Sequence, residues 1–174
     1  NETIRARFLD RDFGRFEISQ STFLDVPGEQ LAFALAPDLL ELFANRKQLG
    51  STLEIRAGIS TGDNSRFIRL WHEVSRQRIC RGRGDAAPWK PHNKGGVFRR
   101  WYGNIEHVLK YSTGSVREMQ ELPGFRHDGR DVYFAPHVSW SEVTSGRPSF
   151  RFYPPGMTFG SGSKAIVGND SELM

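Results

Sequence analysis

Short stretches of alternating apolar and polar residues, separated by turn-forming residues, recur along most of this chain. Because successive side chains of a strand point to opposite faces of a sheet, this alternation is typical of half-buried strands. A continuous apolar run predicts a further, buried strand at 31–36. The alternating stretches predict short strands at 4–8, 53–57, 67–71, 97–102, 105–111, 131–135, 138–143, 149–153 and 164–167.

One stretch has helical rather than strand spacing. Pro37 suits the first turn of a helix, and Ala36, Leu39, Leu40 and Phe43 then recur at intervals of three and four until Gly50. We expect this apolar stripe to pack inward as ordinary core. One or two helices among many short strands predict an α+β fold that is mainly antiparallel β-sheet.

Two segments are expected to be loops. Residues 58–64 carry glycine, serine, threonine, aspartate and asparagine between two strands, and these side chains are able to bond their own backbone. Residues 82–96 hold four glycines and two prolines, which argues against regular structure. Residues 112–130 are polar and rich in turn formers, and no element is assigned there.

The basic residues are concentrated in one segment. The whole chain has 24 basic and 20 acidic side chains, but residues 76–101 alone hold eight basic residues against the single acid Asp85. Such a cluster repels itself unless water or a polyanion neutralises it, and the phosphate backbone of nucleic acid is a common polyanion. We expect these cations on one exposed face; the alternative is a solvated basic loop. They are Arg76, Arg78, Arg81, Arg83, Lys90, Lys94, Arg99 and Arg100.

Signatures of independent catalysis are missing from the sequence. The chain has no nucleophile elbow, no H-E-x-x-H zinc motif and no phosphate-binding loop, and Gly160–Lys164 has the right residue types in the wrong spacing. No acid stands two residues before a lysine, as a nuclease metal site would need. Tyr153–Gly156 holds the only Pro-Pro pair but lacks the Asn or Asp that would grip a flipped adenine.

Neither zinc nor a membrane anchor is expected. The single cysteine, Cys80, has no partner at metal-ligand spacing and is interpreted as a small buried residue at a strand end. No eighteen-residue apolar run occurs. The chain starts with neither an initiator methionine nor a secretion signal, so we expect a cytoplasmic fragment of a longer protein.

Four stretches together carry a resemblance to a known family. Pro27–Gly28 with the following helix, GISTGDNSRFIRLWHEV at 58–74 and WKPHNKGGVFRRWYGN at 89–104 are supported by SWSEVTSGRPSFRFYPPG at 139–156. In combination they resemble the region downstream of the catalytic domain in BREX-type adenine-specific DNA methyltransferases, relatives of type IIG restriction-methylation enzymes. The chain departs from this pattern at His92, where an aromatic residue is expected, and at 81–87 and 112–137.

The resemblance implies a target-recognition domain that holds duplex DNA for phage defence or restriction-modification. A separate domain of the same longer chain would bind S-adenosylmethionine and methylate a flipped adenine on N6. This chain itself would then be non-catalytic and without a cofactor. It would comprise a lead-in from the upstream methyltransferase domain (1–28), the DNA-binding domain (29–168) and a tail (169–174).

On this interpretation the basic segment and the loop at 58–66 straddle a duplex. Lys90, Lys94, Arg99 and Arg100 would neutralise phosphates, contacts that position a protein without specifying sequence. Thr61 would meet phosphates or base edges, and the candidates for reading bases are Asp63, Asn64, Arg66, Asn93 and Arg147. For each of these, satisfaction by its own turn is an open alternative. Phe98, Trp101 and Trp140 are expected in the core rather than stacked on bases.

Two rival functions are considered. In the first, the same surface is a protein-interaction module that docks another defence subunit or an acidic phage protein mimicking DNA. Competition by duplex oligonucleotide would separate this from DNA recognition. The second, an independent hydrolase, has no motif to support it.

Overall fold

The computed structural model describes residues 2–15, 17–26, 28, 35–144 and 146–168. The chain divides into two compact parts, residues 1–51 (unit 1) and 52–174 (unit 2). The boundary at residues 28 and 29 that the sequence suggested lies within unit 1. Within the described residues, no helix is long and apolar enough to cross a bilayer.

Unit 1 is helical. Its elements are helix α1 (Glu2–Leu9), the 3₁₀ turn Gln20–Asp25, helix α2 (Pro37–Asn45) and the 3₁₀ turn Leu49–Ser51. The strand predicted at 4–8 is therefore wrong, because the segment is α1. Glu2 in its first turn and Arg7 in its last complement the helix dipole, and alanine, arginine and leucine are strong helix formers. The strand predicted at 31–36 falls mostly outside the described residues.

The helix predicted from Pro37 is confirmed as α2, although it ends at Asn45 instead of reaching Gly50. Pro37 occupies the first turn, where its missing N–H has no helical partner to lose. The expectation that its apolar stripe packs into a core is wrong for the described chain. Leu39, Leu42 and Phe43 are exposed, and no residue of α2 is buried.

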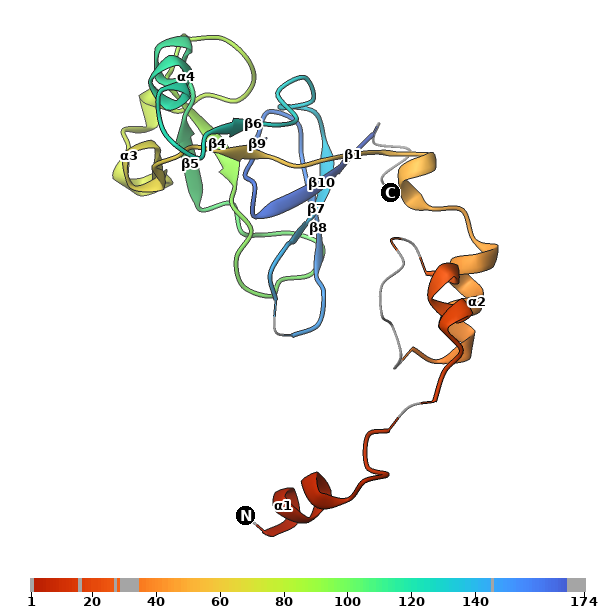
Figure 1. The fold of residues 1–174 in the computed structure, drawn as a ribbon. Helices are drawn as coiled ribbons and strands as arrows, with labels where there is room; N and C mark the ends of the chain where they lie inside the picture. The colour runs from red at the N-terminus through yellow and green to blue at the C-terminus, as the bar shows by residue number, and fades with distance from the viewer. Residues whose placement is uncertain (1, 16, 27, 29–34, 145, 169–174) are drawn as a thin grey trace. The chain divides into compact units, whose positions relative to one another are not determined.

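Unit 2 holds all ten strands of the described chain, two short α-helices and the 3₁₀ turns Trp71–Glu73 and Arg76–Arg78 (Figure 1). The first sheet has the order β1 (Glu54–Arg56), β10 (Ser163–Val167), β7 (His137–Ser141), β8 (Phe150–Tyr153), all antiparallel. The second has the order β3 (Ile68–Leu70), β5 (His107–Lys110), β4 (Trp89–Asn93), β9 (Thr158–Phe159), with only β4 and β9 parallel. A third pairs β2 (Ile59–Ser60) with β6 (Arg126–His127). The predicted α+β class with mainly antiparallel sheet is confirmed.

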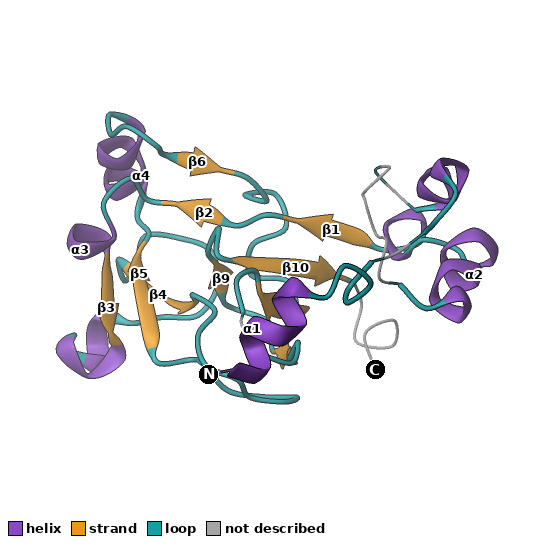
Figure 2. Ribbon diagram, turned by 60° about the horizontal axis from the view of Figure 1, so that its bottom comes forward, coloured by secondary structure: helices purple, strands orange, loops and turns teal. Residues whose placement is uncertain are grey.

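The two larger sheets share one core because the chain passes from β8 into β9 of the other sheet and back into β10. Figure 2 shows β9 between the strands β3, β5 and β4 on one side and β10 on the other. Phe67, Leu109, Met119, Tyr133 and Phe159 are fully buried at the centre of this core. Gly58 permits the close packing, since a Cβ on it would lie 2.1 Å from the carbonyl oxygen of Phe159.

Several predicted elements of unit 2 differ from the structure. Residues 82–96 were expected to lack regular structure, yet β4 lies inside them and pairs with two neighbours. Pro91 is tolerated in β4 because the pairing of β4 with β9 begins only at His92. The N–H that Pro91 lacks therefore costs no hydrogen bond to β9. The predicted strands at 97–102 and 131–135 are wrong: the first is a loop with one isolated bridge, and the second is a series of turns.

The region left unassigned contains helix α4 (Thr113–Gln120), whose Ser112 caps its N-terminus by accepting a bond from the Ser115 N–H at 3.2 Å. A four-residue helix, α3 (Asn64–Phe67), follows the predicted loop, and the strand predicted at 67–71 is confirmed in shortened form as β3. The strands predicted at 53–57, 105–111, 138–143, 149–153 and 164–167 are confirmed in shortened form as β1, β5, β7, β8 and β10.

Candidate nucleic-acid interface

The side chains of the loop at 58–66 are largely occupied within the protein. Asp63 caps α3 by accepting the Arg66 N–H at 3.1 Å, and the hydrogen bond that Ser65 donates to it is the main cause of its lowered pKa. Thr61 is buried and donates to Asn64 Oδ1 at 2.8 Å. Arg66 reaches Glu118 of α4 at 2.6 Å. The loop is thus braced against α4, and of its candidates Asn64 and Arg66 are exposed.

Two candidates on β4 are interior residues. Lys90 is fully buried, and its ammonium donates to Cys80 Sγ at 2.7 Å and to the Gly84 carbonyl at 2.8 Å. Asn93 is also fully buried, and its Oδ1 accepts from the Gly95 N–H and from Ser163. The expectation that Lys90 and Asn93 face DNA is therefore wrong. Residues on both faces of β4 are buried, so neither side chain reaches solvent.

The other seven cations of the basic segment are exposed. Arg81 donates to the Pro155 carbonyl at 3.4 Å, and Arg83 donates to the Asp131 carbonyl at 2.7 Å and lies over the Phe134 ring. Within the described part of the chain, no hydrogen bond or ion pair holds the side chains of Arg76, Arg78 and Lys94. Seven of the eight cations therefore reach the surface, and the expectation that they share one exposed face stays a prediction.

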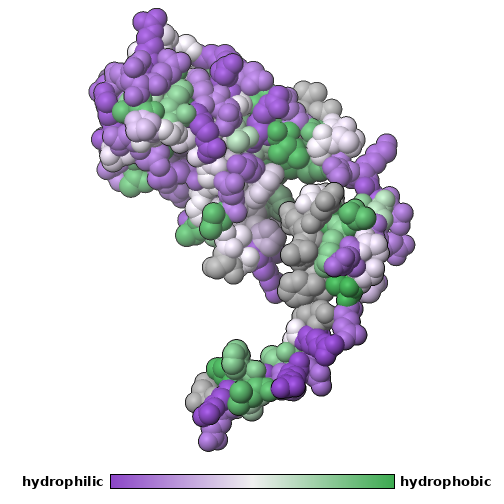
Figure 3. Space-filling view, viewed as in Figure 1, coloured by the Kyte–Doolittle hydropathy of each residue, from purple (hydrophilic) through white to green (hydrophobic). Residues whose placement is uncertain are grey.

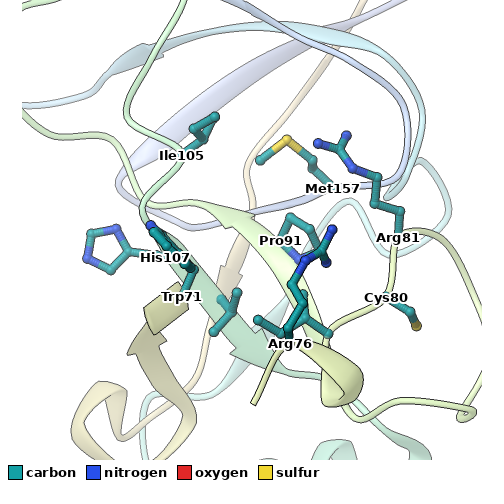
Figure 4. Close-up of a pocket in the computed structure, with 10 residues that line it drawn as sticks. Trp71, Arg76, Cys80, Arg81, Pro91, Ile105, His107 and Met157 are labelled. Carbon is teal, nitrogen blue, oxygen red and sulfur yellow. The ribbon is translucent and has the colours of Figure 1, made fainter. Parts of the chain in front are cut away.

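Arg76 and Arg81 line one cavity together (Figure 4). Its volume is about 420 Å³, and Trp71, Pro91, His107 and Met157 form much of its wall. Burial, and then the nearby charge of Lys94, lower the pKa of His107, so its ring is neutral at pH 7. The cavity therefore combines two guanidinium groups with apolar and aromatic surface, a composition suited to an anionic ligand.

A second exposed region is formed by residues 94–104 together with the described residues of 142–150, which we call the two-loop surface. In Figure 1 the β7–β8 loop projects from unit 2, and the green segment around residue 100 runs beside it. The Ser141 hydroxyl donates to the Gly96 carbonyl at 2.9 Å, and the Trp101 N–H donates to the Phe150 carbonyl at 3.0 Å. Two candidates on the first loop, Arg99 and Arg100, and one on the second, Arg147, belong to this surface.

Aromatic side chains accompany these cations. Phe98 is 55% exposed and Trp101 is 72% exposed, which corrects the expectation that both are core residues. Trp140 is half-buried against Phe150. Figure 3 shows hydrophobic side chains beside hydrophilic ones at the edge of unit 2 where the two loops project. Val97, Phe98, Val143 and Arg147 line a cavity of about 690 Å³ there.

Arg151 lies beneath the two-loop surface and was not a candidate. It is fully buried, and its guanidinium donates to Ser149 Oγ at 2.7 Å, Tyr153 Oη at 3.0 Å, Ser141 Oγ at 3.1 Å and the Arg99 carbonyl at 3.5 Å. None of these partners is a carboxylate. The bonds join β7, β8 and the 97–102 loop, partners that lie up to 52 residues away and that no local sequence pattern reveals.

The comparisons with known proteins agree with the sequence motifs. The chain is 30% identical over 172 residues to the adenine-specific methyltransferase PglX of Lacticaseibacillus casei (strain Zhang), a match that covers 89% of this chain. It is 29% identical over 156 residues to the adenine-specific methyltransferase BrxX of Escherichia coli O9:H4 (strain HS), covering 88% of this chain. This chain resembles one segment of these two methyltransferases.

The match covers only a small part of each relative. The chain spans 14% of the length of PglX and 13% of the length of BrxX. No family model matches it. The resemblance inferred from the four sequence stretches is confirmed by these two relatives.

Proposed function

We propose that this chain is a DNA target-recognition part of an adenine-specific DNA methyltransferase used in phage defence or restriction-modification. The names of the two relatives support the enzyme class. The observation that carries DNA recognition is the surplus of exposed cations: seven arginine and lysine side chains of residues 76–101 reach solvent, with Asp85 as the single acid in that segment. Phosphate neutralisation is the main source of affinity in protein–DNA complexes.

The contacts are assigned to exposed side chains alone. Lys94, Arg99 and Arg100 bind phosphates. Arg76 and Arg78, at the N-terminal end of the basic segment, bind phosphates as well. Arg147, Asn64 and Arg66 remain the candidates for base edges, since each is exposed. Asp63 and Thr61 support the loop that presents Asn64 and Arg66, because their polar atoms bond within it.

Catalysis belongs elsewhere in the longer protein on this proposal. S-adenosylmethionine would bind to an upstream methyltransferase domain, which would methylate an adenine on N6 while this part holds the duplex in the cytoplasm. The chain has none of the catalytic or phosphate-loop motifs sought in its sequence. On this proposal the chain positions the duplex and selects the DNA sequence, and the methyl transfer uses no residue of this chain.

A salt titration tests the proposal. Binding of the chain to a labelled duplex is measured by fluorescence anisotropy between about 50 and 200 mM salt, where each phosphate contact contributes about 0.9 to the log–log slope. The double variant Lys94→Ala/Arg100→Ala should lose affinity and lower the slope by about 1.8. Arg11→Ala, an exposed arginine of unit 1, is the control and should leave the slope unchanged. An affinity that does not fall as salt rises would refute phosphate contacts.

A protein-interaction module is the second candidate, favoured by the exposed apolar residues of the two-loop surface. Such a module would bind another defence subunit or an acidic DNA-mimic protein. Competition decides between the two functions. A DNA reader releases its protein ligand when duplex oligonucleotide is added, whereas a dedicated protein-docking surface keeps it.

A further inference from the structure

Trp101 is held in an unusual backbone conformation. Its φ is +71°, in the left-handed region that residues other than glycine, asparagine and aspartate rarely adopt. A bulky residue there is strained, and such strain persists only where the surrounding structure imposes it. The same residue exposes 72% of its surface, so its indole gains little burial in exchange.

The surrounding structure does impose it. The Trp101 N–H donates to the Phe150 carbonyl at 3.0 Å, and the Trp101 carbonyl accepts from the Phe152 N–H at 2.9 Å. Arg151, between these two residues of β8, is fully buried and donates to the Arg99 carbonyl. The loop is therefore fixed to a sheet strand on both sides of Trp101, and the indole is presented outward from a rigid base.

The neighbours of Trp101 indicate what the indole meets. Phe98 and Tyr102 are exposed on the same loop, and Arg99, Arg100 and Arg147 lie on the same two-loop surface. The acids of this region are engaged with cations: Glu106 lies 3.9 Å from Arg99, and Glu142 lies 3.0 Å from Lys164. Among the described residues no ion pair neutralises Arg100 or Arg147, and aromatic faces beside such cations complement a partner that is both polyanionic and aromatic, which is the chemistry of nucleic acid.

We propose that Trp101 stacks on a base of the bound DNA, at a step where the duplex is kinked or a base has left the helix. Side chains of this kind enter between base pairs and replace the lost stacking. The inference rests on the proposed function, since it assigns a role within the same DNA contact. Phosphate contacts by the adjacent arginines bring the duplex to the indole.

Stacking and phosphate contacts have different signatures. Removing a stacking ring lowers affinity without changing the number of phosphates neutralised, so the salt slope stays the same. A base step that is already open removes the need to break stacking during binding. The chain should therefore prefer a duplex with one mismatch or abasic position over the intact duplex, and Trp101 should account for the preference.

The experiment uses the whole chain and the variant Trp101→Asn. Asparagine tolerates the left-handed backbone, so the fold is kept while the ring is lost. We expect affinity for the mismatched duplex to fall about tenfold, with an unchanged salt slope and an unchanged or raised thermal midpoint. Trp101→Phe should recover most of the affinity. Phe8→Ala is the matched control, because Phe8 is 86% exposed and belongs to unit 1, outside the surfaces assigned to DNA.

Each other outcome overturns the inference in a distinct way. Equal binding of Trp101→Asn and the unchanged chain to both duplexes refutes stacking while leaving phosphate binding intact. A lowered thermal midpoint with no rescue by Trp101→Phe shows that the residue is structural. If Trp101→Asn converts a dimer into a monomer at constant DNA affinity, the surface joins two copies of the chain. Failure of the unchanged chain to bind any duplex refutes the proposed function as well.

Discussion

The ammonium of Lys90 lies 2.7 Å from the sulfur of Cys80, inside unit 2 and away from solvent. A lysine counted among phosphate-binding cations in the sequence is thus an interior residue that ties β4 to the segment before it. The second acceptor of the Lys90 ammonium is the Gly84 carbonyl, which lies in the glycine-rich stretch between Cys80 and Lys90. Lys90 therefore orders this stretch instead of contributing to the surface charge.

Substitution of Lys90 should affect stability and leave DNA binding unchanged. Lys90→Ala leaves a cavity in a closely packed strand, and we expect the free energy of unfolding to fall by about 2–5 kcal/mol. Lys90→Met fills the same space without a buried charge and should lose less than half as much. Urea denaturation measures both. The salt slope of Lys90→Met should equal that of the unchanged chain, and a lower slope would show that Lys90 reaches phosphate after all.

Arg151 should fix the two-loop surface. Arg151→Met removes the hydrogen bonds from a charged donor to Ser149, Tyr153 and the Arg99 carbonyl, and we expect a loss of roughly 2–4 kcal/mol in the free energy of unfolding. Trypsin should also cleave after Arg99 and Arg100 sooner than in the unchanged chain. Arg147→Met, an exposed arginine nearby, should change stability by less than about 0.5 kcal/mol. Equal protease resistance in both variants would contradict this role for Arg151.

The burial of Arg151 also shows where sequence reasoning ends. Alternation in Ser149–Tyr153 correctly predicts β8, because a period of two identifies a strand. It does not say which face is inside. In the structure Phe150 is exposed while Arg151 and Tyr153 are buried, so a charged arginine occupies the buried side of the strand. The partners that make this possible come from three separate segments.

The same limit explains the other differences between sequence and structure. Asn93 is buried because Ser163, 70 residues away, supplies a hydrogen bond to it. β4 was not predicted because prolines and glycines disfavour regular structure locally. Pairing with two distant strands overrides that local preference. The exposure of charged side chains was easier to predict. Seven of the eight cations of 76–101 do reach the surface, since an unpaired charge is costly to bury.

Asp63 should act through its helix cap. It accepts the N–H of Arg66 at the start of α3, and replacing such a cap by alanine costs about 1 kcal/mol. Asp63→Ala should therefore lower the free energy of unfolding by about that amount, while Asp63→Asn, which keeps the acceptor, should be close to neutral. Thermal unfolding of the two variants at one pH measures the difference. Equal losses in both would indicate that the negative charge matters more than the cap.

Two buried histidines should make the stability of unit 2 depend on pH. Burial lowers the pKa of His92 to about 3 and that of His137 to about 4, from an ordinary value of 6.5. As the pH falls below 6.5, these histidines take up protons in the unfolded chain before they do so in the folded chain. The stabilisation from keeping them neutral is therefore complete above pH 6.5 and is lost as the pH falls from there towards 4 and 3.

The free energy of unfolding, measured by urea denaturation between pH 7 and pH 4, should fall by up to about 1.4 kcal/mol per pH unit for each histidine. His137→Gln supplies the control, because glutamine can still donate to the Ala135 carbonyl that His137 Nδ1 contacts at 3.0 Å but does not titrate. Its dependence on pH should be shallower than that of the unchanged chain. Carboxylates alone would give the same slope in both proteins, so identical slopes would rule out His137 as a source of acid sensitivity.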